Sequence, residues 1–381
     1  MPLVLAADTP HDWSRRLASI DALRGLVIVL MALDHAREFF HVAAMSSLPT
    51  DLARTTPLLF MTRWITHVCA PVFAPLAGLG VWLRLQRPGQ RPVQLSRYLV
   101  GRGLWLILLE IVVMRLAMNF SPSLAYPLLL LVLWVLGLSM IALAPLLWLP
   151  PSLVLWGSVA VIAGHHLFDG VRAEDLGRWA GLWRVLHEPG VLALGGNVAV
   201  VGYPLVPWCA VMAAGFGLGP LYAAPAAVRQ RRLLMFGLAS CAAFPVVRLI
   251  NGYGDPTPWV VQPTGVFTLL SFLNTTKYPP SLAFLLMTLG PGLLLAWMER
   301  RPGVQGTPSW SSGGSRCSSS SDTSGCCTRW RPWWRGPFTA MPSGASCGCR
   351  CRRWAGHRRP SRRALATRCG RHTRRGWRCS R

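Results

Sequence analysis

Apolar runs of membrane length recur along most of the sequence and are separated by short polar segments. About 20 apolar residues span a bilayer, and Pro, Gly and Asn punctuate the gaps between the runs. The pattern predicts an all-α, polytopic transmembrane helix bundle. We expect about eight spans, at roughly 19–40, 66–85, 97–118, 125–148, 152–168, 198–221, 232–250 and 280–298.

The composition agrees with a membrane protein up to about residue 303 and then changes. The chain is 52% hydrophobic and 14% charged, against about 25% charged residues in a soluble domain. We expect an N-terminal tail at 1–14, a helical domain at 15–302 and a tail at 303–381. The last segment is crowded with Arg, Cys, Trp and Ser. This segment is either a disordered basic tail or the product of a translation frame that slipped near residue 303. In the second case we expect the chain to be a truncated, inactive protein.

The net charge of +25 comes mainly from that last segment. Residues 301–381 hold 18 Arg and one Asp, and they also hold 8 of the 11 Cys. The helical body keeps only Cys69, Cys209 and Cys241, so it has no disulfide framework and no metal-ligand spacing. We therefore predict no metal and no nucleic-acid partner; the partner is the lipid bilayer.

The distribution of arginine predicts the orientation, because cytoplasmic loops are enriched in Lys and Arg. Arginines precede the first span, lie at 84–97 and 229–232, and follow the last span. With eight spans all four segments share one side. The N-terminus is then cytoplasmic, retained rather than cleaved as a signal peptide, in a bacterial-type inner (plasma) membrane. The connections at 41–65, 169–197 and 251–279 face outward.

Ionisable residues crowd the outer end of the first span. Asp34, Glu38 and His41 share one helix face, and His35 lies beside them. Charged groups at membrane depth are costly and by default suggest function, although a polar collar at the headgroups would use the same residues.

The outer ends of other spans carry further polar groups: His67, Asn119, His165, His166, Asp169, Arg248, Asn251 and Lys277. Histidine is the usual general base near neutral pH. These residues form either one outward-facing site or the ordinary polar rim. We expect Asp34, His35 and His67 to approach one another there.

Two charges lie deeper, Glu110 and Arg115 in the third predicted span. A spacing of five does not place them side by side, so we expect a partner for each on another helix, such as Arg102 or Arg24. Lys277, the only lysine, either anchors a phosphate or carboxylate or lies at the interface. The loops at 251–259 and 273–281 are rich in turn formers.

No Walker loop, dinucleotide fingerprint, GxSxG or HExxH motif occurs in the body. However, the opening RLASIDALRGLVIVLMALDHAREFFH resembles the bacterial branch of the heparan-alpha-glucosaminide N-acetyltransferase catalytic-domain family. Further stretches carry the resemblance over about residues 15–300: 55–78, YPLVPW at 203–208, 249–256 and FLNTTKYPPSL at 272–282.

The resemblance implies an integral membrane acyltransferase that moves an acetyl or other acyl group, with acetyl-CoA as donor, to an amino sugar or another envelope glycan or lipid acceptor. A histidine would take a proton from the acceptor or be acylated transiently, and Asp34 would orient it. We expect the catalytic residues among Asp34, His35 and His67, with His41 a further candidate. The expected substrate-binding residues are Arg37, Glu38, Asn251, Asp255, Asn274 and Lys277.

A second class of function is a transporter, or a non-enzymatic membrane protein, with a polar cavity. Intramembrane charges and helices broken by Pro and Gly fit that class as well. The sequence has no corresponding halves that suggest an inverted repeat, which favours the enzyme.

Overall fold

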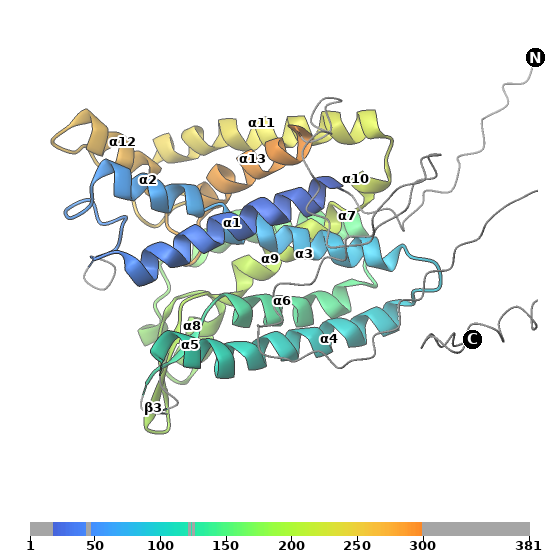
Figure 1. The fold of residues 1–381 in the computed structure, drawn as a ribbon, viewed down its shortest axis with the longest axis horizontal. Helices are drawn as coiled ribbons and strands as arrows, with labels where there is room; N and C mark the ends of the chain where they lie inside the picture. Colours follow the sequence, from blue (N-terminus) through green and yellow to red (C-terminus); the bar gives the residue numbers. More distant parts are fainter. Residues whose placement is uncertain (1–17, 43–46, 121–122, 124–125, 299–381) are drawn as a thin grey trace, which may run out of the picture. The chain divides into compact units, whose positions relative to one another are not determined.

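Helices make up most of the computed structural model (Figure 1), which describes residues 18–42, 47–120, 123 and 126–298. These residues belong to one compact unit, Met1–Ser309. The tails predicted at 1–14 and 303–381 lie outside the described residues.

The longer helices follow the predicted spans along the chain. They are α1 (Ala18–Phe40), α3 (Cys69–Leu85), α4 (Pro92–Leu109), α6 (Val132–Leu146), α7 (Pro151–Gly164), α9 (Leu205–Gly217), α11 (Ala226–Ile250) and α13 (Leu282–Met298). The shorter ones are α2 (Pro57–Thr66), a π-helical turn η1 (Glu110–Met114), α5 (Arg115–Asn119), the 3₁₀ turns η2 (His165–Phe168) and η3 (Ala173–Trp179), α8 (Ala180–Leu186), α10 (Pro220–Ala223) and α12 (Gly265–Leu273).

Four helical runs of the described chain are long and apolar enough to cross a membrane: Pro57–Leu85, Pro151–Phe168, Leu205–Ala223 and Ala226–Ile250. Val132–Leu146 and Leu282–Met298 are apolar but shorter. The protein is therefore a mostly helical membrane protein, and the count of eight spans stays a prediction.

A three-stranded sheet corrects the all-α prediction. Its order is β1 (Leu128–Leu130), β3 (Asn197–Val201), β2 (Gly190–Leu194), with β1 parallel and β2 antiparallel to β3. Gly195 and Gly196 join β2 to β3 with φ of 51° and 98°, which two-residue hairpin turns require and glycine adopts freely. The predicted spans at 125–148 and 198–221 therefore begin later, as α6 and α9.

Close backbone approach holds α3 against α9. A Cβ added at Gly78 would lie 1.9 Å from the Met212 carbonyl oxygen, and one at Gly215 would lie 2.1 Å from that of Pro75. Only glycine fits at either position. Small residues at helix contacts are typical of membrane bundles, where packing rather than water exclusion drives association.

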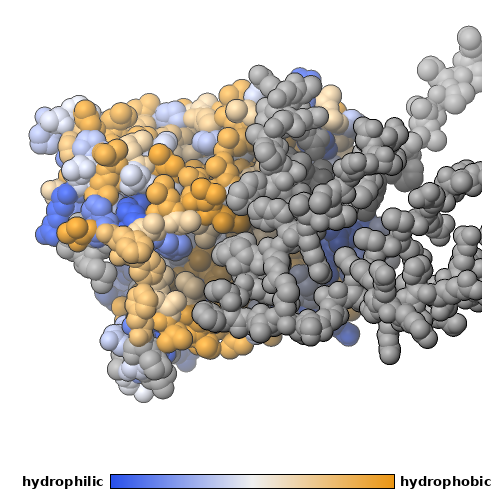
Figure 2. All heavy atoms as spheres, in the orientation of Figure 1, coloured by the Kyte–Doolittle hydropathy of each residue, from blue (hydrophilic) through white to orange (hydrophobic). Residues whose placement is uncertain are grey.

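Large apolar side chains cover the outside of the helices. Ile28 and Val29 on α1, Leu104 on α4, and Val246 and Leu249 on α11 are each more than half exposed. Figure 2 shows the same apolar surface over much of the visible described chain. Exposed apolar area on this scale is the face that a bilayer would cover.

The three connections predicted to share one side do lie together at one end of the helices (Figure 1). Asn274 Nδ2 donates to the Thr50 carbonyl oxygen at 3.1 Å, the Leu282 N–H donates to His166 Nε2 at 2.9 Å, and the Tyr253 hydroxyl donates to the Ala163 carbonyl oxygen. Which side of a membrane this end faces stays a prediction.

The prediction that an arginine pairs with Glu110 is wrong. Its Oε2 accepts from the backbone N–H groups of Leu133 at 2.7 Å and Trp134 at 3.2 Å, the first residues of α6. Helix N-termini present unpaired N–H groups and a positive dipole end, which a carboxylate satisfies. Arg24 instead donates to the Leu76 carbonyl oxygen, and Arg115 to that of Tyr126.

Candidate functional site

The break between α2 and α3 positions the central residue of the site. Thr56 caps α2, because its side chain accepts from the Leu59 N–H at 3.3 Å, and Pro57 occupies the first turn. The helix ends at Thr66, and the next residue is His67, whose N–H still donates to the Arg63 carbonyl oxygen. His67 thus lies at the turn between two helices rather than inside one.

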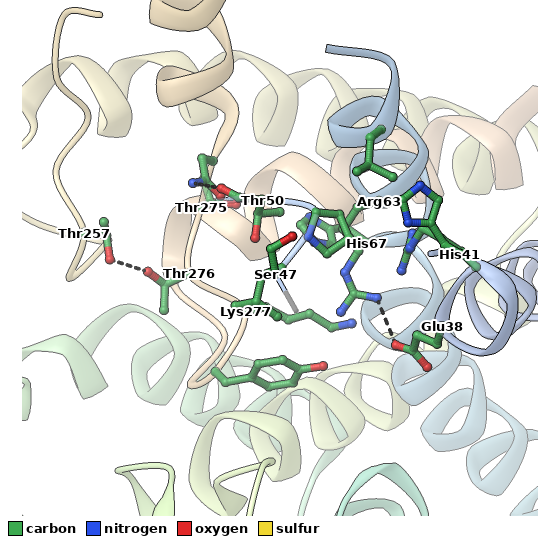
Figure 3. A pocket seen from close by; sticks show the side chains of 16 residues that line it. Glu38, His41, Ser47, Thr50, Arg63, His67, Thr257, Thr275, Thr276 and Lys277 are labelled. Carbon is green, nitrogen blue, oxygen red and sulfur yellow. Dashed lines mark hydrogen bonds and ion pairs between the residues drawn. The ribbon is translucent and has the colours of Figure 1, made fainter. Parts of the chain in front are cut away.

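A polar cavity of about 350 Å³ opens beside this turn (Figure 3). Its walls come from the end of α1, from α2, and from the connections at 47–50 and 257–278. The lining residues are Arg37, Glu38, His41, Ser47, Leu48, Pro49, Thr50, Leu59, Arg63, His67, Thr257, Asn274, Thr275, Thr276, Lys277 and Tyr278. Segments more than 200 residues apart in the sequence therefore form one site.

His67 is the buried imidazole of the cavity. The residue is 3% exposed, and its ring packs edge-on against Phe284 with 5.4 Å between centroids. Its Nδ1 has no hydrogen-bond partner among the described residues. A buried polar nitrogen without a partner is unfavourable by roughly 1–3 kcal/mol. A ligand that forms a hydrogen bond with this nitrogen would remove that cost.

Asp34 is bound by cations and a hydroxyl, not by a histidine. Arg63 Nη1 donates to its Oδ1 at 2.8 Å and to its Oδ2 at 2.6 Å, and Thr66 Oγ1 donates at 2.7 Å. Arg37 donates to the same carboxylate. Asp34 therefore fixes Arg63 in the cavity wall, and Arg63 also lies 3.7 Å from Glu38 Oε1. The expectation that Asp34 orients a histidine is not met in this arrangement.

Lys277 brings a positive charge into the cavity. Figure 3 shows its side chain running toward Arg63 and Glu38, and its Nζ lies 5.2 Å from the ring centroid of Tyr278. No carboxylate pairs with it among the described residues. An unpaired ammonium in a cavity favours an anionic or carbonyl-bearing ligand.

The other histidine candidates differ from His67. His35 is outside the cavity lining, and its Nδ1 lies 3.2 Å from Glu38 Oε2 with both side chains 45% exposed. His41 lines the cavity but is exposed. Among the catalytic candidates, Asp34 is linked to His67 indirectly, because it accepts hydrogen bonds from Arg63 and Thr66 at the end of α2, next to His67. His35 lies at the rim.

Two of the expected substrate-binding residues act in turns instead of lining the cavity. Asn251 ends α11 with φ of 53°, and its side chain binds both the N–H and the carbonyl oxygen of Trp259. Asp255 accepts from the N–H and hydroxyl of Thr276 and from the Ser281 hydroxyl. Asn274 does line the cavity, but its amide donates to the Thr50 carbonyl oxygen.

Comparison with known families adds an independent observation. Residues 16–251 match the model of the catalytic domain of heparan-alpha-glucosaminide N-acetyltransferase. The chain belongs to this family. No curated protein and no solved structure matches it.

Membership in the heparan-alpha-glucosaminide N-acetyltransferase catalytic family implies a membrane acetyltransferase. The matched region contains α1, α2 and His67. It stops at residue 251, yet residues between 257 and 278 supply part of the lining of the cavity. The part of the chain after the match is therefore needed to complete the cavity.

Sequence reasoning on this family member missed Arg63, Thr66 and Tyr278. Arg63 could have been predicted, because it is a charged residue inside the apolar, membrane-length run Pro57–Leu85. The same kind of pattern singles out Asp34. Nothing in the local sequence singles out Thr66 or Tyr278, because threonine and tyrosine are common at the ends of membrane helices.

Proposed function

We propose that this chain is an acyltransferase of the bacterial inner membrane, with a cytoplasmic N-terminus. It transfers an acetyl group from acetyl-CoA to an amino sugar or another envelope glycan or lipid acceptor. The observation that carries the proposal is His67, a buried imidazole that lines the polar cavity and whose Nδ1 has no hydrogen-bond partner among the described residues, in a chain whose family transfers acetyl groups.

In the proposed reaction His67 handles the proton or the acetyl group. On the direct route, the acceptor nitrogen or oxygen attacks the thioester carbonyl carbon while His67 removes its proton; the carbon–sulfur bond breaks, and the thiolate leaves and takes up a proton. On the covalent route, a His67 nitrogen attacks the thioester carbonyl carbon, the carbon–sulfur bond breaks, and the CoA thiolate leaves with the ring proton. The acceptor then attacks the acetyl-imidazole, the bond between the acetyl carbon and His67 breaks, and the imidazole takes up the acceptor's proton. Both routes begin from the neutral imidazole, because only an unprotonated ring nitrogen can take a proton or attack the thioester.

Arg63 and Lys277 are suited to the negative charge that develops on the carbonyl oxygen. Fixed positive groups in a site shielded from water stabilise such an oxyanion strongly and need no reorganisation during the reaction. Asp34 is the positioning residue in this scheme, since it holds the Arg63 guanidinium through two hydrogen bonds. Lys277, which has no carboxylate partner among the described residues, binds either the oxyanion or an acidic group on the acceptor.

The size of the cavity suits the acceptor and the acetyl group rather than the whole donor. A volume of about 350 Å³ is near the lower end for ligand pockets, which run from about 300 to 1,000 Å³. In the proposed arrangement the CoA nucleotide stays outside this cavity, with its phosphates bound by arginine at the cytoplasmic end.

The direct test uses purified full-length protein in detergent or nanodiscs with radiolabelled acetyl-CoA and a panel of amino sugars, since the tail cysteines would disturb thiol-based assays. We expect label to move to at least one acceptor, with mass spectrometry showing one added acetyl group. Absence of label on every acceptor and on the protein itself, together with no release of CoA, would contradict the proposal.

A further inference from the structure

A second polar cluster lies beyond the cavity, where α7 ends. His165 and His166 in η2, Asp169 just after it, and His187 after α8 come together there, and none of them lines the cavity. The three histidines are 4%, 6% and 6% exposed. Ligand-type atoms of His165, His166 and Asp169 all lie within 4.8 Å of one another. A polar rim at the membrane surface consists of exposed side chains, whereas these three imidazoles are buried around one carboxylate.

His166 has both ring nitrogens in use. Its Nε2 accepts the Leu282 N–H at 2.9 Å, so its proton lies on Nδ1, which donates to Asp169 Oδ2 at 2.7 Å. An imidazole held in this way cannot also offer a lone pair. His166 therefore acts on the cluster by orienting Asp169, in the way that ligating carboxylates at metal sites are held by hydrogen bonds from neighbouring residues.

His165 is in the opposite situation. Neither of its ring nitrogens makes a hydrogen bond of ordinary geometry among the described residues, although the Pro280 carbonyl group lies near the ring. Leaving the lone pair of a buried imidazole without a partner is unfavourable. A ligand that binds an imidazole lone pair would remove that penalty.

His187 joins the cluster through Asp169, whereas the group whose ligand atoms all lie within 4.8 Å of one another consists of His165, His166 and Asp169. His187 Nε2 lies 3.2 Å from Asp169 Oδ1, and its ring faces that of His165 at 70° with 5.6 Å between centroids. Zinc binds imidazole nitrogen and carboxylate oxygen at about 2.0–2.2 Å. Tetrahedral geometry at these bond lengths sets ligand atoms roughly 3.4 Å apart, close to the distance between His187 Nε2 and Asp169 Oδ1.

We propose that His165, Asp169 and His187 bind a divalent transition-metal ion, with Zn²⁺ the best match, and that His166 positions the carboxylate. Imidazole-rich sites select such ions over Mg²⁺ or Ca²⁺, which prefer oxygen ligands. Three protein ligands leave a fourth position for water, on the side where the Asp169 side chain is 23% exposed. The ion would tie η2 to α8. This proposal replaces the sequence-based expectation of no metal and is independent of the proposed reaction.

The test titrates Co²⁺ into the full-length protein in detergent after chelator treatment and alkylation of the tail thiols. We expect one equivalent to bind with the intense visible bands of tetrahedral cobalt and to be displaced by one equivalent of Zn²⁺. His165→Gln, His187→Gln and the near-isosteric Asp169→Asn should each raise the dissociation constant at least tenfold. His35→Gln, outside the cluster, should bind as the unchanged protein does, with circular dichroism confirming the fold of each variant.

Two results would overturn the site. One is a wild-type chain that takes up no stoichiometric Co²⁺ or Zn²⁺ at micromolar concentration. The other is equal affinity in the wild-type chain and in folded Asp169→Asn and His187→Gln, which would assign any binding to the tail. In either case the cluster is a hydrogen-bond network that only joins the loops.

Discussion

The ion pair between Asp34 and Arg63 joins α1 to α2 beneath the cavity. Each side chain is 14% exposed, and the carboxylate has three donors. Removing one partner of a buried ion pair leaves a charge without compensation. The pair therefore supports the fold and the position of Arg63 at the same time.

Asp34→Asn should destabilise the protein by about 3 kcal/mol and lower its activity, because Arg63 loses its main anionic partner. Thermal unfolding in detergent would measure the first effect. Asp51→Asn is the matched control, since Asp51 pairs with Arg54 at 4.0 Å with both side chains well exposed, and exposed pairs contribute roughly 0–1 kcal/mol. Equal melting temperatures for the two variants would contradict the assignment.

Glu110 offers a second test at this scale. Glu110→Ala removes the acceptor for the Leu133 and Trp134 N–H groups and should destabilise the protein by about 2 kcal/mol. Glu110→Gln keeps an acceptor oxygen and should restore most of the loss. If the two substitutions lowered the melting temperature equally, the negative charge and not the cap on α6 would be the stabilising feature.

At the scale of elements, glycines set the distance between helices. A Cβ at Gly103 on α4 would lie 2.5 Å from the Gly137 carbonyl oxygen on α6, whereas one at Gly101 on the same helix meets nothing within 4 Å. The backbone of α6 cannot yield as a flexible side chain would, so an added methyl group must push the two helices apart.

Gly103→Ala should therefore lower the melting temperature markedly. Gly101→Ala should leave it unchanged or raise it slightly, because alanine favours a helix over glycine by about 1 kcal/mol. The two variants have the same composition and differ only in the face they occupy. A melting temperature of Gly103→Ala equal to that of Gly101→Ala would mean that α4 and α6 do not pack as described.

The same scale shows what the sequence could predict. Length and hydrophobicity were enough to locate the longer helices but not the short ones, because membrane helices must satisfy their backbone internally and are continuous apolar runs. They could not reveal β1, since three leucines beside an apolar helix carry no period of their own. They placed the start of a span at residue 66, next to the break at His67, but missed α2, which lies largely in the predicted connection at 41–65. The cavity was only partly predictable, since its far wall comes from residues 257–278 by long-range folding.

For the whole molecule, the main prediction is its orientation in the membrane, with the cavity on the outer side. Pro88→Cys between α3 and α4 and Val261→Cys between α11 and α12 add thiols at exposed positions. In intact cells an impermeant maleimide should label the second variant above the parent chain and leave the first at the parent level. The reverse labelling pattern would show that the orientation is opposite to the predicted one, with the cavity on the cytoplasmic side.

The central claim is that His67 performs the transfer, and its most direct test is the acetyl-transfer rate of His67→Gln beside that of His35→Gln. Glutamine fills a similar volume but cannot take a proton or carry the acetyl group, so His67→Gln should lose at least about 100-fold in kcat with its melting temperature nearly unchanged. His35→Gln should lose far less, since His35 lies outside the cavity. A folded His67→Gln that retains wild-type kcat, or a larger loss in His35→Gln, would contradict the account.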